Sequence, residues 1–146
     1  MNAEISLKVE NFAREAELPD GVFHDPLMFV NVVRGGISGA MLKRGADASG
    51  LSRKLIGSAL SVDPSNISRL FRRKHLTLEQ GEAALETFRL WLKAMTTFED
   101  EAKAQLWMES GIPAFGGKTP AEMLDTHKGR QLVDNALNRI EYGEFI

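Results

Sequence analysis

The spacing of apolar residues along the chain predicts an all-α protein. Apolar positions recur three and four residues apart, and the strict alternation and Asn-Gly turns typical of hairpins are nearly absent. The run Pro26 to Val33 fits a helix or a buried strand by period alone. Because the neighbouring segments are helical, we expect a helix that ends at Gly35 and Gly36, followed by another from Ser38 to Asp47.

The first twenty residues give a weaker signal. Their apolar periodicity is poor, and they end in the turn sequence Leu18-Pro19-Asp20-Gly21. We expect either a loose helix or a segment that depends on a partner for its order.

Two short helices with a tight connection are predicted in the middle of the chain. Ser52 is a suitable N-cap for a helix that runs to about Leu60. Asp63 and Pro64 then supply a favoured N-cap and first position for a second helix, expected to reach Lys74. The second helix divides into an apolar side with Ile67, Leu70 and Phe71, and a polar side with Ser65, Asn66, Arg69, Arg72 and Arg73.

The remaining half of the chain is also predicted to be helical. Thr77 to Gln80 forms a capping box that opens a helix to about residue 97, and a further helix is expected over 99–109. A loop over 114–118 precedes a second capping box, Thr119 to Glu122. The last helix should begin near Asp125 or Thr126, end at Gly143, and bury Leu132, Val133, Ala136, Leu137 and Ile140.

Charge is unevenly distributed although the chain carries only −2 overall. Residues 43–75 hold eight basic and two acidic side chains, whereas the segments before and after are both net acidic. A basic centre between acidic flanks favours one face for a polyanion. A basic cluster that merely keeps a surface solvated would produce a similar pattern.

Together, the cap, the short connection, the polar face and the charge predict a helix-turn-helix that binds operator DNA. In such units the N-terminal part of the second helix reaches base edges in the major groove, which nominates Ser65, Asn66 and Arg69. Residues farther along or on the preceding helix would contact phosphates: Arg53, Lys54, Arg72, Arg73 and Lys74.

No enzyme, metal site or cofactor site is predicted. The three histidines are dispersed, cysteine is absent, and there is no G-x-S-x-G motif. Gly116 to Thr119 resembles the end of a phosphate-binding loop, but the first glycine of that motif would fall at Ile112. Without a signal peptide or an apolar run of bilayer length, we expect a soluble cytoplasmic protein with no membrane partner.

The C-terminal third resembles a known family. The sequence from Ala114 to Thr126, with the Gly-Gly-Lys-Thr-Pro loop, and the terminal Arg139-Ile140-Glu141-Tyr142-Gly143 are similar to the C-terminal domain of Xre–MbcA–ParS antitoxins. A looser resemblance extends upstream to Pro26 and downstream to Phe145. Gly81 stands where the family commonly has serine, and the second helix lacks the family's usual Thr-Arg-Arg start.

This resemblance implies an antitoxin that neutralises a RES-domain toxin, which consumes NAD or transfers ADP-ribose from it, by blocking its active site. It also implies a homodimer that represses its own operon. We therefore expect an N-terminal arm (1–25), an Xre-like helix-turn-helix region (26–97) and a toxin-binding domain (98–146). The residues expected to face the toxin are Gly116, Gly117, Lys118, Thr119, Arg130, Asn135, Asn138, Arg139, Glu141 and Tyr142. The alternative is a stand-alone helix-turn-helix regulator whose C-terminal helices only dimerise.

Overall fold

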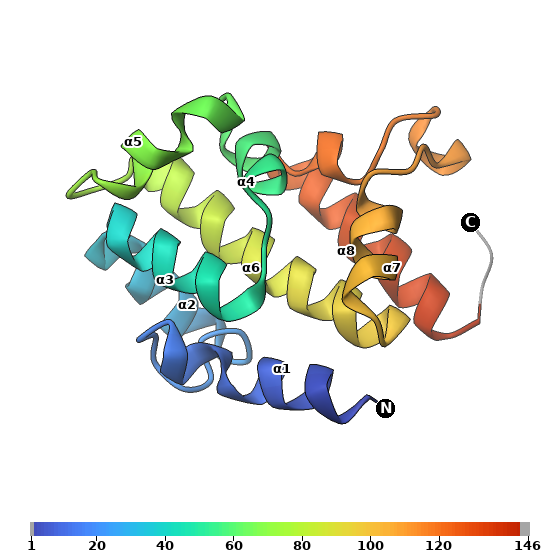
Figure 1. Cartoon of the computed structure of the whole chain (residues 1–146), viewed down its shortest axis with the longest axis horizontal. Coiled ribbons are helices and arrows are strands. Elements are labelled where there is room, and N and C mark those ends of the chain that lie inside the picture. The colour runs from blue at the N-terminus through green and yellow to red at the C-terminus, as the bar shows by residue number, and fades with distance from the viewer. Residues whose placement is uncertain (1, 144–146) are drawn as a thin grey trace.

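The computed structural model describes residues 2–143, which form helices and turns without any strand (Figure 1). The predicted all-α class is confirmed. The α-helices are α1 (Ala3–Glu15), α2 (Pro26–Gly35), α3 (Gly39–Ser49), α4 (Arg53–Leu60), α5 (Ile67–Phe71), α6 (Leu78–Phe98), α7 (Glu101–Met108) and α8 (His127–Glu141). Three single 3-10 turns complete the structure: η1 (Pro64–Asn66), η2 (Pro113–Phe115) and η3 (Ala121–Met123).

Side-chain caps begin most of these helices where the sequence predicted them. The Ser52 hydroxyl accepts from the Leu55 N–H at 3.2 Å, and Thr77 and Gln80 form the reciprocal bonds of a capping box. The hydroxyl of Thr126 accepts from Gly129 at 3.0 Å at the start of α8. Each cap satisfies a backbone donor that has no partner within its helix.

Helix α6 is the central element of the fold. It packs against α1, α2, α3, α4, α7 and α8, so both halves of the chain are assembled on it. The predicted apolar stripe is buried along its length, with Trp91 only 1% exposed. The Trp91 indole N–H donates to the carbonyl oxygen of Ser49 at 2.8 Å, which pairs the one polar atom of this large buried side chain.

The N-terminal arm is a regular helix and contributes to the core. Phe12 is 1% exposed, and its ring centroid lies 5.3 Å from that of Phe88 and 5.9 Å from that of Phe23. Within α1 only Ile5 and Phe12 are buried, two turns apart. This sparse spacing explains why the periodicity of the first twenty residues is weak.

One hydrophobic cluster extends from Ile5 on α1 to Leu137 on α8. The three regions expected from the sequence therefore share a core, and the boundary between 97 and 98 falls at the last residues of α6. Residues 144–146 of the last region lie outside the described part of the chain. Among residues 2–143, no helix is both long and apolar enough to cross a membrane.

Three local predictions were wrong. The helix after Asp63 ends at Phe71, because Arg72 and Arg73 tighten into i→i−3 bonds before the chain turns back to α3. Glu99, expected at the start of a helix, adopts a left-handed conformation (φ 56°) that ends α6, so α7 begins only at Glu101. Leu132, expected in the core, is 43% exposed.

Candidate functional site

The predicted two-helix unit is held together by apolar contacts and by a short connection. From α5, Ile67 is fully buried and Leu70 is 4% exposed. Ser61 takes a left-handed conformation between the helices, and Asp63 accepts from the backbone N–H and the hydroxyl of Ser65 at 2.9 and 2.7 Å. These two bonds lower the pKa of Asp63, so this cap stays charged at neutral pH.

Helix α3 fixes α5 from the other side. Gly39 lies so close to the end of α5 that an added methyl group would overlap the Leu70 carbonyl oxygen. The Gly39 N–H also donates to the Arg73 carbonyl at 2.9 Å, and the Leu76 N–H donates to that of Ile37 at 2.8 Å. The segment after α5 is thus tied to α3, although it is no longer helical.

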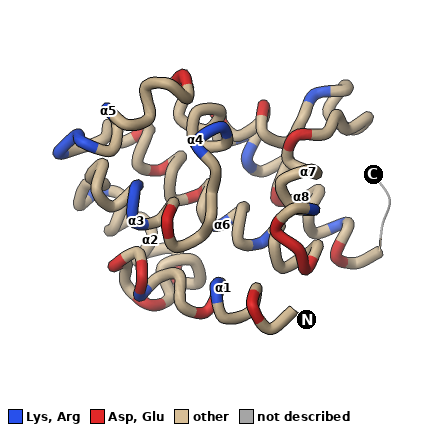
Figure 2. The backbone as a smooth tube through the Cα atoms, in the orientation of Figure 1, with Lys and Arg blue, Asp and Glu red and all other residues tan. Residues whose placement is uncertain are grey.

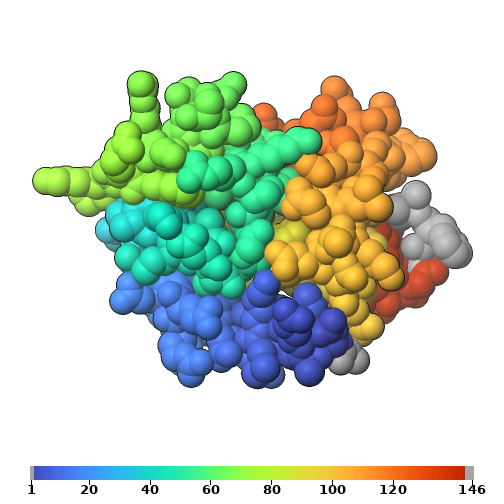
Figure 3. Space-filling view, in the orientation of Figure 1, coloured from blue at the N-terminus to red at the C-terminus, as the bar shows by residue number. Residues whose placement is uncertain are grey.

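We define the basic surface as the exposed polar side chains on and around α5: Ser65, Asn66, Arg69, Arg72, Arg73 and Lys74. Its four cations form no ion pair with any residue in 2–143. Arg73 donates a hydrogen bond to the uncharged side chain of Gln80 at 3.5 Å. In Figure 2 basic residues gather on the chain beside α5, and Figure 3 shows long side chains projecting from that end of the molecule.

Other basic residues of the same segment are neutralised. Lys43 pairs with Asp47 at 2.9 Å, and Arg44 pairs with Glu17 at 2.7 Å. Uncompensated positive charge in the basic centre is therefore concentrated around α5, which is the arrangement that a polyanion would select.

Two of the predicted DNA contacts lie on α4 and are already engaged. The Arg53 guanidinium stacks over the Phe71 ring at 5.3 Å and donates to the Ser68 hydroxyl at 2.9 Å, so it braces α4 against α5. Lys54 pairs with Glu109 at 2.9 Å, and the bond from Lys54 lowers the pKa of that carboxyl. Arg53 and Lys54 are thus set apart from the basic surface by their contacts.

The loop after α7 is closed by backbone hydrogen bonds. The N–H groups of Ile112 and Gly117 donate to the carbonyls of Lys118 and Ile112, both at 3.0 Å. Gly116 and Gly117 have φ values of 67° and 84°, which favour glycine. Thr119 and Glu122 form the predicted reciprocal bonds, although only a 3-10 turn follows them. Gly116, Gly117 and Lys118 are exposed, so the loop presents a hydrogen-bonded backbone to solvent.

Helix α8 has a continuous exposed side. We define the α8 stripe as Lys128, Leu132, Asn135, Arg139 and Tyr142, which are spaced alternately four and three residues apart and are all exposed. Tyr142 is 82% exposed, so it does not pack on the core. Glu141 is exposed and Asn138 half-buried at the flanks, whereas Ile140 is half-buried.

Arg130 differs from the other residues expected to face a partner. It is 7% exposed, and its guanidinium donates to the Leu124 carbonyl at 2.9 Å. In this structure the side chain therefore joins α8 to the preceding turn. The sequence did not nominate Lys128 or Leu132 as toxin-facing residues. The buried positions Val133, Ala136 and Leu137 already satisfy the helical period, and this spacing could have revealed that Leu132 is exposed.

The comparisons with known proteins bear on this end of the chain. Residues 93–143 match the family described as the antitoxin Xre/MbcA/ParS C-terminal toxin-binding domain. The match spans the end of α6, α7, the closed loop and α8. Over this span the chain is similar to the toxin-binding domain of the Xre/MbcA/ParS antitoxins.

Two curated relatives of the chain carry related names. The chain is 25% identical over 130 residues to the "Prs ADP-ribosylating antitoxin" of Sphingobium sp. strain YBL2, covering 82% of each protein. It is 29% identical over 76 residues to "Antitoxin Xre" of Pseudomonas putida strain KT2440, covering 52% of the chain and 48% of that relative. The family is one of antitoxins and not of enzymes, in agreement with the sequence prediction.

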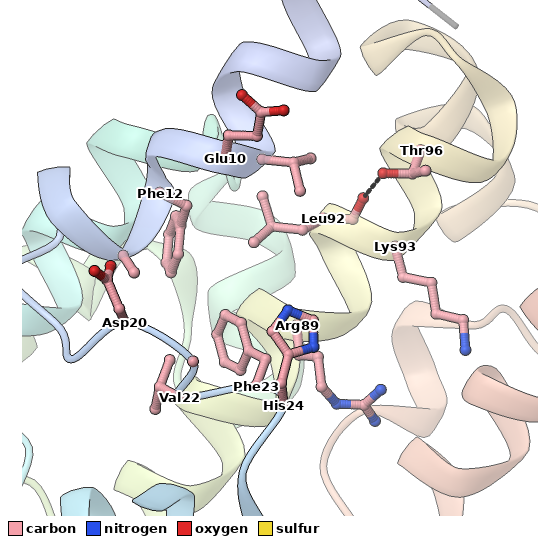
Figure 4. A pocket seen from close by; sticks show the side chains of 13 residues that line it. Glu10, Phe12, Asp20, Val22, Phe23, His24, Arg89, Leu92, Lys93 and Thr96 are labelled. Atoms are coloured by element: carbon pink, nitrogen blue, oxygen red, sulfur yellow. Dashed lines mark hydrogen bonds between the residues drawn. The ribbon is translucent and has the colours of Figure 1, made fainter.

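A cleft of about 510 Å³ lies between α1, the 20–24 loop and α6 (Figure 4). Phe12, Phe23 and Leu92 give it an apolar lining. The charged ends of Arg89 and Lys93 point away from these rings, and both bind Asp134 on α8, at 3.3 and 2.5 Å. The two cations at this rim thus join α6 to α8.

The Asp134 ion pairs predict a pH-dependent contribution to stability. Burial raises the pKa of Asp134, but the hydrogen bond from Lys93 and the charges of Arg89 and Lys93 outweigh it, so the pKa is below its ordinary value. We expect Asp134→Asn to lower the free energy of unfolding at pH 7 by about 1–2 kcal/mol, because two partly buried cations lose their acceptor.

The direction in which stability changes with pH follows from this lowered pKa of Asp134. The stabilisation is complete above the unfolded pKa of about 3.9 and is lost as the pH falls through the lower folded value. Urea unfolding of both proteins should therefore give a gap at pH 7 that shrinks below about pH 4. Asp47→Asn, which breaks the exposed pair with Lys43, is the control and should cost about 0.5 kcal/mol or less. A gap for Asp134→Asn that persisted at low pH would contradict the assignment.

Proposed function

We propose that this antitoxin neutralises a cognate RES-domain toxin by covering its active site, and that it represses its own operon through a dimeric helix-turn-helix. The observation that carries the proposal is the matched toxin-binding domain, whose last helix holds an exposed polar stripe at the opposite end of the molecule from α5. The separation allows one molecule to hold a toxin and DNA at the same time.

The chemistry of the α8 stripe supports an NAD-using toxin as the partner. Arg139 and Asn135 offer cationic and amide donors, and the exposed Tyr142 ring offers a stacking surface. These groups suit a pocket shaped for pyrophosphate and ribose. The name of the Sphingobium relative includes the word ADP-ribosylating, which supports the same class of toxin. The closed loop, Gly116 to Thr119, would form the second part of the toxin-facing surface.

Operator binding is proposed for the basic surface. Ser65 and Asn66, in the turn η1, and Arg69, in α5, would reach base edges, while Arg72, Arg73 and Lys74 would contact phosphates. Arg53 and Lys54 could join them only by exchanging their present partners. The division into an arm, a DNA-binding region and a toxin-binding domain is part of the same proposal.

Co-expression with a RES-domain protein encoded next to this chain tests the proposal. The expected result is a complex that survives affinity purification and size-exclusion chromatography, and a toxin that arrests growth only when the antitoxin is absent. A chain that binds operator DNA but captures no such toxin would instead favour the stand-alone regulator.

A further inference from the structure

Helix α2 exposes apolar side chains on the side that faces away from the core. Seven of its ten residues are apolar or proline; Val33 is buried, and Met28, Phe29 and Val32 pack half-buried against the core, whereas two others point outward. Leu27 is 67% exposed and Val30 38% exposed. Isolated exposed leucines such as Leu106 on α7 are ordinary in soluble proteins, but two exposed apolar residues one turn apart, beside the exposed Leu78, indicate a surface that another molecule covers.

The exposed residues of α2 form a ridge between two grooves. We define the α2 ridge as Leu27, Val30, Asn31 and Arg34, which are spaced i, i+3, i+4 and i+7 and so lie on one helix face. On one flank, a groove of about 240 Å³ is lined by Phe29, Val33, Glu82 and Leu78, which is itself 62% exposed. On the other, a groove of about 420 Å³ is lined by Pro19, Met28 and Val32.

We propose that the α2 ridge is the dimer interface of this antitoxin, and that its occupant is the α2 ridge of a second copy in antiparallel orientation. This inference rests on the dimeric repressor of the proposed function and gives it a surface. A ridge flanked by grooves is complementary to itself, because each ridge fills a groove of its partner when two helices pack. A two-fold axis then uses the same residues on both sides.

The charges of α2 favour the antiparallel arrangement. Asp25 caps the N-terminus of the helix, with its carboxylate accepting from Leu27 and Met28, and Arg34 lies in the last turn. Arg34 has no ion-pair partner among residues 2–143. The midpoint of the ridge falls between Val30 and Asn31, so an antiparallel partner brings its Asp25 end to Arg34. The two helix dipoles are then opposed as well.

The position of α2 fits both other activities. Figure 1 places α2 at the end of the molecule that carries α5, and α8 at the other end. Gly36, just after α2, lies next to His75 in the segment that follows α5. A two-fold axis at the α2 ridge therefore sets two basic surfaces on either side of itself and leaves both α8 stripes uncovered.

Light scattering coupled to size-exclusion chromatography of the full chain tests the interface. We expect the wild type to be a dimer at micromolar concentration and Val30→Glu to dissociate it, with the dimer Kd raised about 100-fold, because a carboxylate would be buried without a partner. Leu106→Glu is the matched control: it replaces a more exposed apolar residue on α7 and should leave the dimer intact.

Cysteine cross-linking gives a second measurement that does not depend on weakening the dimer. The chain has no cysteine, so Asn31→Cys introduces a single thiol next to the proposed axis, where it faces its own copy. Mild oxidation should convert Asn31→Cys, but not Leu106→Cys, into a covalent dimer on a non-reducing gel.

The outcomes separate this inference from the proposed function. A monomeric wild type overturns both the interface and the dimeric repressor. A dimer that persists in Val30→Glu, or that cross-links through Leu106→Cys, overturns the α2 ridge alone. Val30→Glu should still capture the toxin; if capture is abolished, the toxin and not a second copy covers α2, and the inference is wrong.

Discussion

Replacing Arg69 and Arg73 with glutamine should abolish the proposed operator binding without unfolding the chain. Both side chains are exposed and neither has an acidic partner among the described residues, so their removal costs the fold little. In a groove-bound complex, Arg69 would contribute about 1–3 kcal/mol of base discrimination and Arg73 would contribute a phosphate contact. We expect a loss of at least about 100-fold in affinity.

A gel-shift or fluorescence-anisotropy titration over a range of salt concentrations measures this effect. Removing one cation that neutralises a phosphate should reduce the slope of log K against log salt by about 0.9. Lys103→Gln with Lys128→Gln removes the same charge from exposed positions outside the basic surface and should leave specific binding nearly unchanged. Equal reductions of affinity in the two double variants would mean that net charge, and not α5, holds the DNA.

The second large effect is expected at the other end of the molecule. Arg139→Glu combined with Tyr142→Ala should release the activity of the toxin, because both side chains point to solvent from the α8 stripe and would fill the toxin pocket. Charged and aromatic anchors at the centre of an interface carry about 2 kcal/mol or more each, so we expect capture to weaken at least about 100-fold. Growth of co-expressing cells and co-purification of the toxin report the result.

A matched control lies on α1, outside the family match. Arg14→Glu with Leu7→Ala reverses an exposed charge and truncates an exposed apolar side chain, as the test variant does. It should neutralise the toxin normally. Deleting residues 138–146 should also release the toxin, but it removes the half-buried Asn138 and Ile140, so the point variants are the sharper test. Full neutralisation by Arg139→Glu/Tyr142→Ala would place the toxin elsewhere.

The sequence predicted the helices well because their signals are local. Caps such as Ser52 and Thr77 act within one turn, and the stripe along α6 repeats from Gly81 to Met95. The end of α5 was missed because it is set by bonds to α3, which no nearby residue type announces. The order of α1 was missed for a similar reason, since it depends on Phe12 meeting Phe88 from a distant helix.

The candidate surfaces show the same division. The helical period of the sequence predicted which side chains around α5 are exposed. The pairing of Lys54 with Glu109 and the burial of Arg130 could not be predicted in this way, because they depend on elements that only folding brings together. The exposure of α2 could not be predicted either. An apolar run looks the same in a sequence whether it faces the core or a partner, and only the packed structure distinguishes the two.

Helix α6 limits where the gene for this chain can be recombined. The family match begins at residue 93, inside a helix that starts at Leu78 and is buried by neighbours from both halves of the chain. A chimera could join the C-terminal end of one homologue to the N-terminal end of another at residue 93. Its helix α6 would then consist of two halves taken from different proteins. A crossover placed in the loop before Thr77 keeps α6 whole with the C-terminal end. The contacts of α6 with helices α1 to α4, those of α4 with η3, and the ion pair of Lys54 with Glu109 then need to be rematched.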